Sequence, residues 1–149
     1  MKAKLFGRIA AAVLLLSAAT ATAHDFEVNG IFYNKDDENN TASVTYKGSS
    51  YDAYANEYSG AVTIPSEVYY EEITYSVTSI GDFAFQWCSG LTSVVIPNSV
   101  SSISGNAFLG CSGLTSVVIP NSVTKIGINV FDKCSGLTSV EIPNSVTSI

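Results

Sequence analysis

The sequence reads CSGLTSVVIPNSVSSISGNAFLG at 88–110, CSGLTSVVIPNSVTKIGINVFDK at 111–133 and CSGLTSVEIPNSVTSI at 134–149. The first two stretches are 23 residues long and identical at their first thirteen positions. The third keeps the same register as far as the sequence runs. A fixed period of this length is the signature of a repeat protein, in which each unit stacks on its neighbours. The sequence therefore predicts a β-rich solenoid with one coil per repeat.

Within each repeat, the segment LTSVVI has the composition of a short strand, being rich in β-branched and apolar residues. Leu91, Val94 and Ile96 have the spacing L-x-x-L-x-L of a leucine-rich-repeat strand. Since side chains alternate between the two faces of a strand, the next question is which face is turned to water.

The third repeat answers it, because Glu141 occupies the slot that Val95 and Val118 fill in the first two repeats. A lone carboxylate is tolerated only where it stays solvated. We therefore expect Ser93, Val95 and their equivalents to point outward. Val94, Ile96 and their equivalents, including Val140 and Ile142, are expected to point into the core.

A proline follows each strand segment and ends it, because proline has no N–H to donate to a ladder. An Asn-Ser pair then supplies turn chemistry. Apolar residues, Val100, Ile103 and Phe108 in the first repeat, return the chain to the next coil. Some slots differ between the two full repeats and tolerate charge, so we expect them on the outside: Ser101/Thr124, Ser102/Lys125, Gly105/Ile128, Leu109/Asp132 and Gly110/Lys133.

Three cysteines, Cys88, Cys111 and Cys134, begin the three repeats. An odd number at identical spacing fits a disulfide framework poorly. Cysteine often packs as a small buried hydrophobe, so the spacing favours a buried ladder. A bridge between two neighbours is the alternative, because stacked coils lie near the separation that a disulfide accepts.

The phrase LTSVVIPNSVTKIG…F…CSG resembles the BspA-like leucine-rich-repeat family, over roughly Val77–Ile149. The resemblance implies a right-handed solenoid with a parallel sheet on its concave side. It also implies a bacterial surface or secreted protein that adheres to host or bacterial partners and is not a catalyst. Ser99, Ser122 and Ser145 would stand where longer leucine-rich repeats keep a ladder-forming Asn.

The N-terminus predicts export. Residues 1–8 carry three basic residues, 9–19 are apolar or small, and Ala21-Thr22-Ala23 fits signal-peptidase cleavage after residue 23. Beyond it the chain keeps four Lys against thirteen Asp and Glu, a formal charge of about −9. Such acidity disfavours nucleic acid and anionic lipid as partners. No later segment is apolar and long enough to span a membrane, so we expect a secreted or cell-surface protein.

Residues 24–60 lack the repeat and are expected to form a β-rich cap. Asn29-Gly30 separates two alternating segments, Phe26–Val28 and Ile31–Tyr33, which predicts a β-hairpin. Thr41–Lys47 alternates again. The solenoid is expected to cover 61–149, in units 61–87, 88–110, 111–133 and 134–149, the first being degenerate, with an insertion at Val68–Tyr75.

All eight tyrosines lie between positions 33 and 75. Tyr51, Tyr54 and Tyr58 have the spacing of a short helix. The cluster is interpreted as packing of the cap; an aromatic ligand-binding patch is the alternative.

The sequence offers little catalytic or metal-binding chemistry. His24 is the one histidine, and a triad or copper site built on it would lack further histidines. Asp36-Asp37-Glu38 is interpreted as a solvated loop, because calcium wants six or more oxygens from a shaped loop. We therefore predict no catalytic residue, no metal and no cofactor: the protein is not expected to be an enzyme.

The leading hypothesis is an extracellular binding module that recognises a protein or glycan through the outward strand face. The candidate residues are Ser93, Val95, Ser116, Val118, Ser139 and Glu141. The alternative is a spacer or stalk, which the near-identity of the repeats favours. Since Ile149 falls partway round a coil, we also expect further repeats or a C-terminal cap to follow it.

Overall fold

The computed structural model describes residues 24–52 and 56–149, so the predicted export signal lies outside the described residues. The regular structure in this part is β-strand. A three-stranded sheet has the order β4-β7-β9, and a seven-stranded sheet has the order β1-β2-β3-β6-β8-β10 with β5 on β6. The strands are β1 (Phe26–Val28), β2 (Ile31–Asp36), β3 (Thr41–Thr45), β4 (Gly60–Thr63), β5 (Glu67–Tyr70), β6 (Ile73–Ile80), β7 (Leu91–Val95), β8 (Ser102–Ile103), β9 (Ser116–Val118) and β10 (Lys125–Ile126).

The N-terminal region consists of antiparallel hairpins. β1 and β2 pair around Asn29-Gly30, whose φ angles of 51° and 78° are both positive. A tight two-residue turn of this kind requires positive φ at both positions, which is why Asn-Gly predicts it. β2 then pairs antiparallel with β3. The hairpin predicted from the sequence at 26–33 is therefore present.

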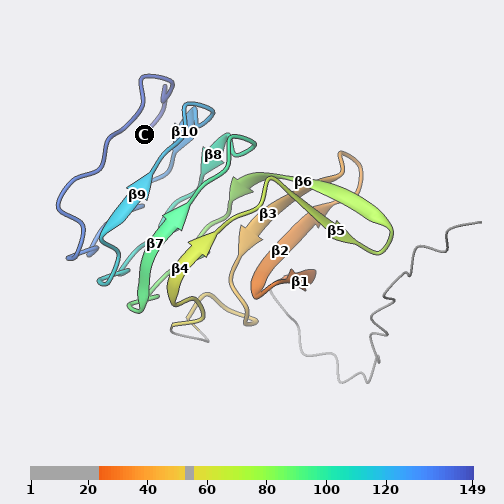
Figure 1. Cartoon of the computed structure of the whole chain (residues 1–149), viewed down its shortest axis with the longest axis horizontal. Helices are drawn as coiled ribbons and strands as arrows, with labels where there is room; N and C mark the ends of the chain where they lie inside the picture. The colour runs from red at the N-terminus through yellow and green to blue at the C-terminus, as the bar shows by residue number, and fades with distance from the viewer. Residues whose placement is uncertain (1–23, 53–55) are drawn as a thin grey trace, which may run out of the picture.

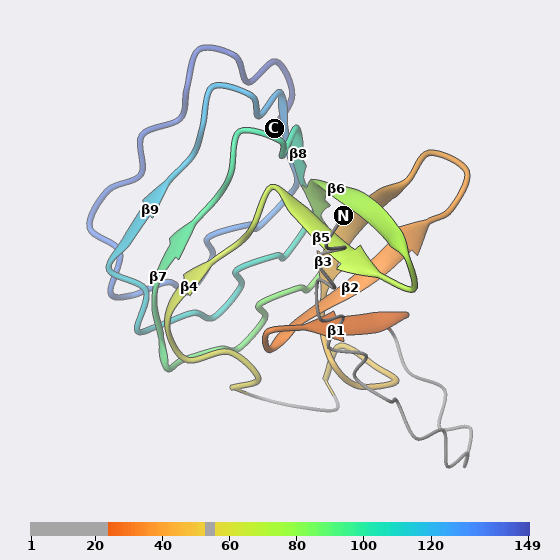
Figure 2. The same ribbon diagram turned by 45° about the vertical axis from the view of Figure 1, so that its right-hand side comes forward.

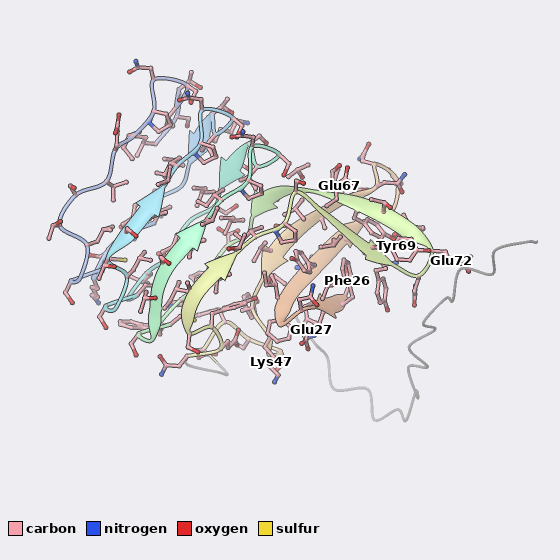
Figure 3. All side chains as sticks on the ribbon, viewed as in Figure 1. Phe26, Glu27, Lys47, Glu67, Tyr69 and Glu72 are labelled. Carbon is pink, nitrogen blue, oxygen red and sulfur yellow. The ribbon has the colours of Figure 1, made fainter. Side chains whose placement is uncertain are left out.

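The segment predicted as an insertion, Val68–Tyr75, lies in a further hairpin made by β5 and β6. Its turn is formed by Glu71 and Glu72, with φ angles of 47° and 69°. These residues replace the Asn and Gly that favour such a turn, so the sequence gives no hairpin signal there. Figure 3 shows Tyr69 and Glu72 near the far tip of this hairpin, well away from β7 and β9.

β6 joins the hairpins to the repeats. It pairs in parallel with β3 on one side and with β8 on the other, and β8 pairs in parallel with β10. Consequently one sheet runs from the hairpins into the solenoid, as Figure 1 shows from orange to blue.

The second sheet, β4-β7-β9, is parallel throughout, with Val62 opposite Val94 and Val94 opposite Val117. Figure 2 shows successive coils stacked, each passing from this sheet across to the side that carries β6, β8 and β10. The return side of each coil also bonds to the next coil through its backbone: Phe85 N–H donates to Ala107 O at 2.7 Å and Phe108 N–H to Val130 O at 3.1 Å. Coils therefore share hydrogen bonds on more than one side, as a stacked repeat requires.

Identical slots stack on one another in the core. The rings of Phe85, Phe108 and Phe131 are stacked, with centroids 4.9 Å and 5.6 Å apart. Offset stacking of this kind adds to the burial of the rings themselves.

The three cysteines form the predicted buried ladder, and all are free thiols. Cys111 Sγ donates to Phe85 O at 3.0 Å, and Cys134 Sγ to Phe108 O at 3.1 Å. Burial raises the pKa of the Cys88 thiol to about 11. Since the thiolate is the reactive form, Cys88 is a poor nucleophile.

A serine ladder lies at the turn after each strand. Ser122 Oγ donates to Val100 O at 2.7 Å, and Ser145 Oγ donates to Val123 O at 2.8 Å. The equivalent Ser99 Oγ is buried and has no hydrogen-bond partner among the described residues. The serines thus take the ladder position that the family resemblance implied, with the first one unsatisfied.

One slot expected outside is instead buried. Gly110 lies beneath the indole of Trp87, and a Cβ on Gly110 would stand 2.2 Å from Cε3 of that ring. Gly110 also has φ of +75°. Lys133, in the same slot one coil on, is exposed and places its ammonium 5.4 Å from the Trp87 ring centroid. The slot tolerates charge only where no indole covers it.

The tyrosines largely follow the packing interpretation. Tyr33, Tyr58 and Tyr75 are buried. Tyr58 Oη donates to Thr45 O at 2.7 Å and accepts from Phe32 N–H at 3.1 Å, joining the loop before β4 to β2 and β3. Tyr51 is partly exposed and stacks on Phe83. Tyr54, and with it part of the predicted helix, lies outside the described residues.

Candidate functional site

The candidate site is the outward face of β7 and β9. In β7, Val94 is 2% exposed and faces the core, whereas Val95 is 56% exposed. Val95 lies opposite Val118, which is 75% exposed, and Thr63 of β4 lies opposite Val95. Because neighbouring strands are about 4.8 Å apart, these side chains form a continuous outward column. Its direction is the one predicted from Glu141.

A second column of hydroxyls lies beside the first. Ser93 is half-buried and lies opposite Ser116, which is exposed. Ser139, the third candidate of this column, is exposed as well. The face therefore offers a row of small polar groups next to a row of methyl groups.

The last coil does not continue the strand pairing that builds these columns. On the far side it is bonded to the coil before it: Thr147 N–H donates to Thr124 O and Ile126 N–H to Ser148 O, both at 2.9 Å. On the candidate face, the segment 137–142 is not a strand and does not pair with β9. Glu141 is exposed, as the paired Val95 and Val118 are, but no strand pairing holds it in register with Val118.

The same unpaired segment contains Ile142, which was predicted to lie in the core. Its side chain is 41% exposed. In the described residues Ile142 has a coil on one side only, and it lies at a groove and not in a sealed interior. The equivalent Ile96 and Ile119, at 6% and 7% exposure, are buried as predicted.

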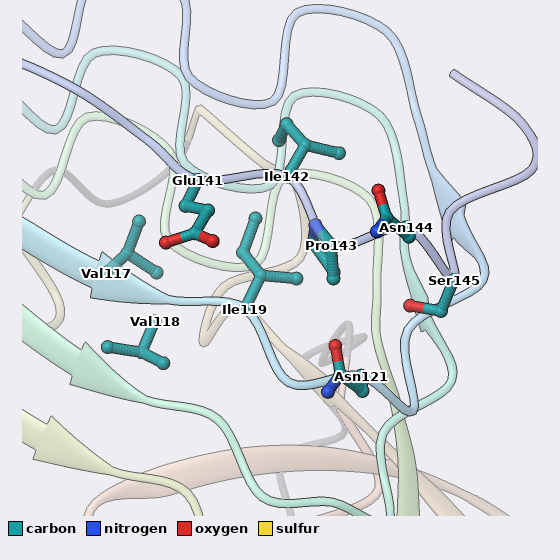
Figure 4. Close-up of a pocket in the computed structure, with 9 residues that line it drawn as sticks. All are labelled: Val117, Val118, Ile119, Asn121, Glu141, Ile142, Pro143, Asn144 and Ser145. Carbon is teal, nitrogen blue, oxygen red and sulfur yellow. The ribbon is translucent and has the colours of Figure 1, made fainter.

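The groove between β9 and the last coil has a volume of about 630 Å³ (Figure 4). Its apolar lining lies in the middle, the Glu141 carboxylate points into it from one end, and amide and hydroxyl groups lie at the other end. It is lined by Val117, Val118, Ile119, Asn121, Glu141, Ile142, Pro143, Asn144 and Ser145.

The electrostatics of this face are simple. Among the segments that form it, 60–64, 90–97, 113–120 and 136–143, Glu141 is the one charged residue. The face is therefore a mostly neutral, partly apolar surface with a single negative charge beside its groove.

The described residues contain no group of three or more His, Cys, Asp or Glu side chains placed to hold a metal ion. His24 Nδ1 lies 2.8 Å from Lys47 O. Within the same part of the chain, no helix has the length and apolarity needed to cross a bilayer.

A family model for the BspA-type leucine-rich repeat region matches residues 62–149 with six copies. The chain belongs to the BspA-type leucine-rich-repeat family. Leucine-rich-repeat solenoids carry extended binding surfaces, so membership indicates a protein-interaction module. No match was found among curated proteins.

Solved structures agree with this assignment. A leucine-rich repeat protein from Bacteroides ovatus is 34% identical with a TM-score of 0.72, and the match covers 85% of this chain and 32% of that one. A leucine rich cell surface protein from Faecalibacterium prausnitzii is 33% identical with a TM-score of 0.67, covering 83% and 32%. A leucine-rich repeat protein from Bacteroides capillosus is 28% identical with a TM-score of 0.71, covering 87% and 88%. The chain thus spans about a third of the length of the first two.

Sequence reasoning missed two features of the surface. The groove residues Asn121, Asn144 and Ile142 gave no signal, because the same residue types repeat in every coil and the groove lies beside the unpaired segment 137–142. Trp87 could have been found from the sequence, because it stands in the position that Gly110 and Lys133 fill in the next two repeats. The structure adds that its φ is 57°, which is unusual for so bulky a residue.

Proposed function

We propose that this protein is a non-catalytic, exported binding or adhesion module. It recognises a host or bacterial protein or glycan through the outward face of β4, β7 and β9. In this proposal residues 1–23 direct export, residues 24–60 cap the solenoid, and the coil is right-handed with the strand face on its concave side. The contact residues are Ser93, Val95, Ser116, Val118, Ser139 and Glu141.

The observation that carries the proposal is the exposure of Val95 and Val118. Adjacent β-branched side chains at 56% and 75% exposure contribute little to folding. The groove of mixed polar and apolar lining lies beside them, and exposed apolar side chains that cluster on a surface mark interaction sites. The surrounding hydroxyls supply the polar rim that interfaces usually have.

The test is selection of ligands on the purified chain from a phage-displayed dodecapeptide library and a glycan array. Val95→Asp and Val118→Asp are then measured against the ligands obtained. Ile128→Asp is the matched control, because Ile128 is an equally exposed apolar residue, at 69%, on the return side of the coil. We expect the two Val variants to lose binding and Ile128→Asp to keep it. Equal binding by all three would rule out this face.

The near-identity of the repeats supports a second candidate function, a spacer that presents another domain. A spacer predicts that neither selection yields a ligand whose binding depends on Val95 or Val118. Peptides or glycans that depend on those residues would argue against it.

A further inference from the structure

The groove beside β9 has a chemistry that narrows the partner, and this inference rests on the proposed function of the strand face. One end holds the Glu141 carboxylate beside Val118, and the middle is lined by Ile119 and Ile142 (Figure 4). A ligand group that satisfies both must be long, aliphatic along its stem and positively charged at its tip. Lysine and arginine side chains are built in this way, since they bury their methylene stems against apolar surface and keep the charge at the end.

We propose that the groove receives an arginine or lysine side chain of a partner protein. Its cationic head pairs with the Glu141 carboxylate, and its stem lies against Val118 and Ile142. An apolar side chain of the same partner, next to the cation, rests on the exposed methyl groups of Val95 and Val118.

The charge of the molecule supports a cationic partner. No lysine or arginine lies in the segments that form this face, so no positive group of the face competes for Glu141. The sequence after position 23 carries four Lys against thirteen Asp and Glu. A surface of this sign draws positively charged segments toward it and repels anionic ones.

The groove is large enough for one such side chain and more. A volume of about 630 Å³ exceeds what a single long side chain fills, so the groove can admit it together with water and part of the partner's backbone. Asn121 and Asn144, at the other end, offer amide groups to that backbone. Interface hydrogen bonds of this kind fix orientation more than they add affinity.

The experiment uses the phage-displayed dodecapeptide library on the purified chain and on the Glu141→Gln variant. For the unmodified chain we expect selected peptides to be enriched in Arg or Lys next to Val, Ile, Leu or Phe. For Glu141→Gln the enrichment in Arg and Lys should disappear while the apolar preference remains. Glu67→Gln is the matched control, because Glu67 is an exposed residue of β5, outside the strand face (Figure 3). This substitution should leave the enrichment in Arg and Lys unchanged.

A peptide selected on the unmodified chain should bind Glu141→Gln about fivefold more weakly at low salt, and the difference should shrink as salt rises. Peptides that depend on Val118 but show no preference for cations would overturn the cation proposal and leave the strand-face function intact. If glycans bind in a way that depends on Val118 and no cationic peptides are selected, the ligand is a glycan and the proposal of a protein partner is overturned. Ligands that ignore both Val118 and Glu141 would overturn both proposals.

Discussion

The N-terminal hairpins and the repeats share one sheet but are stabilised by different kinds of contact. In the hairpins each contact occurs once: Phe26 stacks on Tyr70 at 4.5 Å and on Tyr33 at 5.3 Å. In the repeats each residue meets its own equivalent 23 positions away, as Phe85 meets Phe108. Uniqueness fixes the register of an antiparallel sheet, whereas repetition lets one favourable contact recur along the stack. The stability of the N-terminal hairpins therefore depends on individual contacts. The stability of the repeats depends on contacts between equivalent positions of successive coils.

The largest expected change in stability comes from removing one of the stacked phenylalanine rings. Phe108 is fully buried between Phe85 and Phe131, so Phe108→Ala should lower the free energy of unfolding by about 3–5 kcal/mol. Phe131 is only half-buried, and Phe131→Ala should cost clearly less. Urea unfolding of the two variants measures both values. Equal losses would show that burial within the stack does not set the contribution of the slot.

A second prediction concerns Gly110, a position at which the repeats differ because the Trp87 indole covers it. Gly110→Ala should destabilise the protein by about 2–3 kcal/mol, because the new Cβ meets the Trp87 ring and the backbone has positive φ. In the double variant with Trp87→Ala the steric part should be relieved and only the backbone part should remain. Thermal unfolding of the single and double variants checks this. If Trp87→Ala brings no recovery, the indole is not the cause.

The serine ladder provides a matched pair within one slot. Ser122→Ala should cost about 1 kcal/mol, because Val100 O loses its 2.7 Å hydrogen bond. Ser99→Ala should cost nothing or stabilise slightly, since the Ser99 hydroxyl is buried with no partner among the described residues. The midpoints of urea unfolding of the two variants measure these changes. A larger loss of stability for Ser99→Ala than for Ser122→Ala would contradict the serine ladder.

The smallest effect is expected in the β5–β6 hairpin. Glu71 and Glu72 both have positive φ, a conformation that Asn and Gly adopt more readily. The double substitution Glu71→Asn with Glu72→Gly should therefore raise stability by about 0.5–1 kcal/mol. Glu67→Gln, which removes a charge from β5 without touching the turn, is the control. A double variant no more stable than that control would count against strain in the turn.

Much of the solenoid could be predicted from sequence, since its evidence is repeated. A single change, Val to Glu141, separated the outward column from the inward one, and the burial of Val94 and exposure of Val95 confirm it. The Asn29-Gly30 hairpin was predictable for another reason: only a few residue pairs favour its turn.

The remaining features depend on contacts that no local pattern encodes. The β5–β6 hairpin has a turn without turn residues, and the burial of Gly110 depends on an indole 23 residues earlier. The exposure of Ile142 and the groove beside it occur where 137–142 does not pair with β9, although the sequence LTSVEI there differs from LTSVVI by one residue.

The central claim is that Val95 and Val118 serve recognition and not folding. Its most direct test is the double variant Val95→Thr with Val118→Thr, which keeps the β-branched shape and replaces one methyl group of each side chain by a hydroxyl. Urea unfolding and the affinity for ligands selected on the strand face are measured on the same samples. We predict a free energy of unfolding within about 0.5 kcal/mol of the unmodified chain and an affinity lowered at least about tenfold. A clear loss of stability with unchanged affinity would contradict the claim.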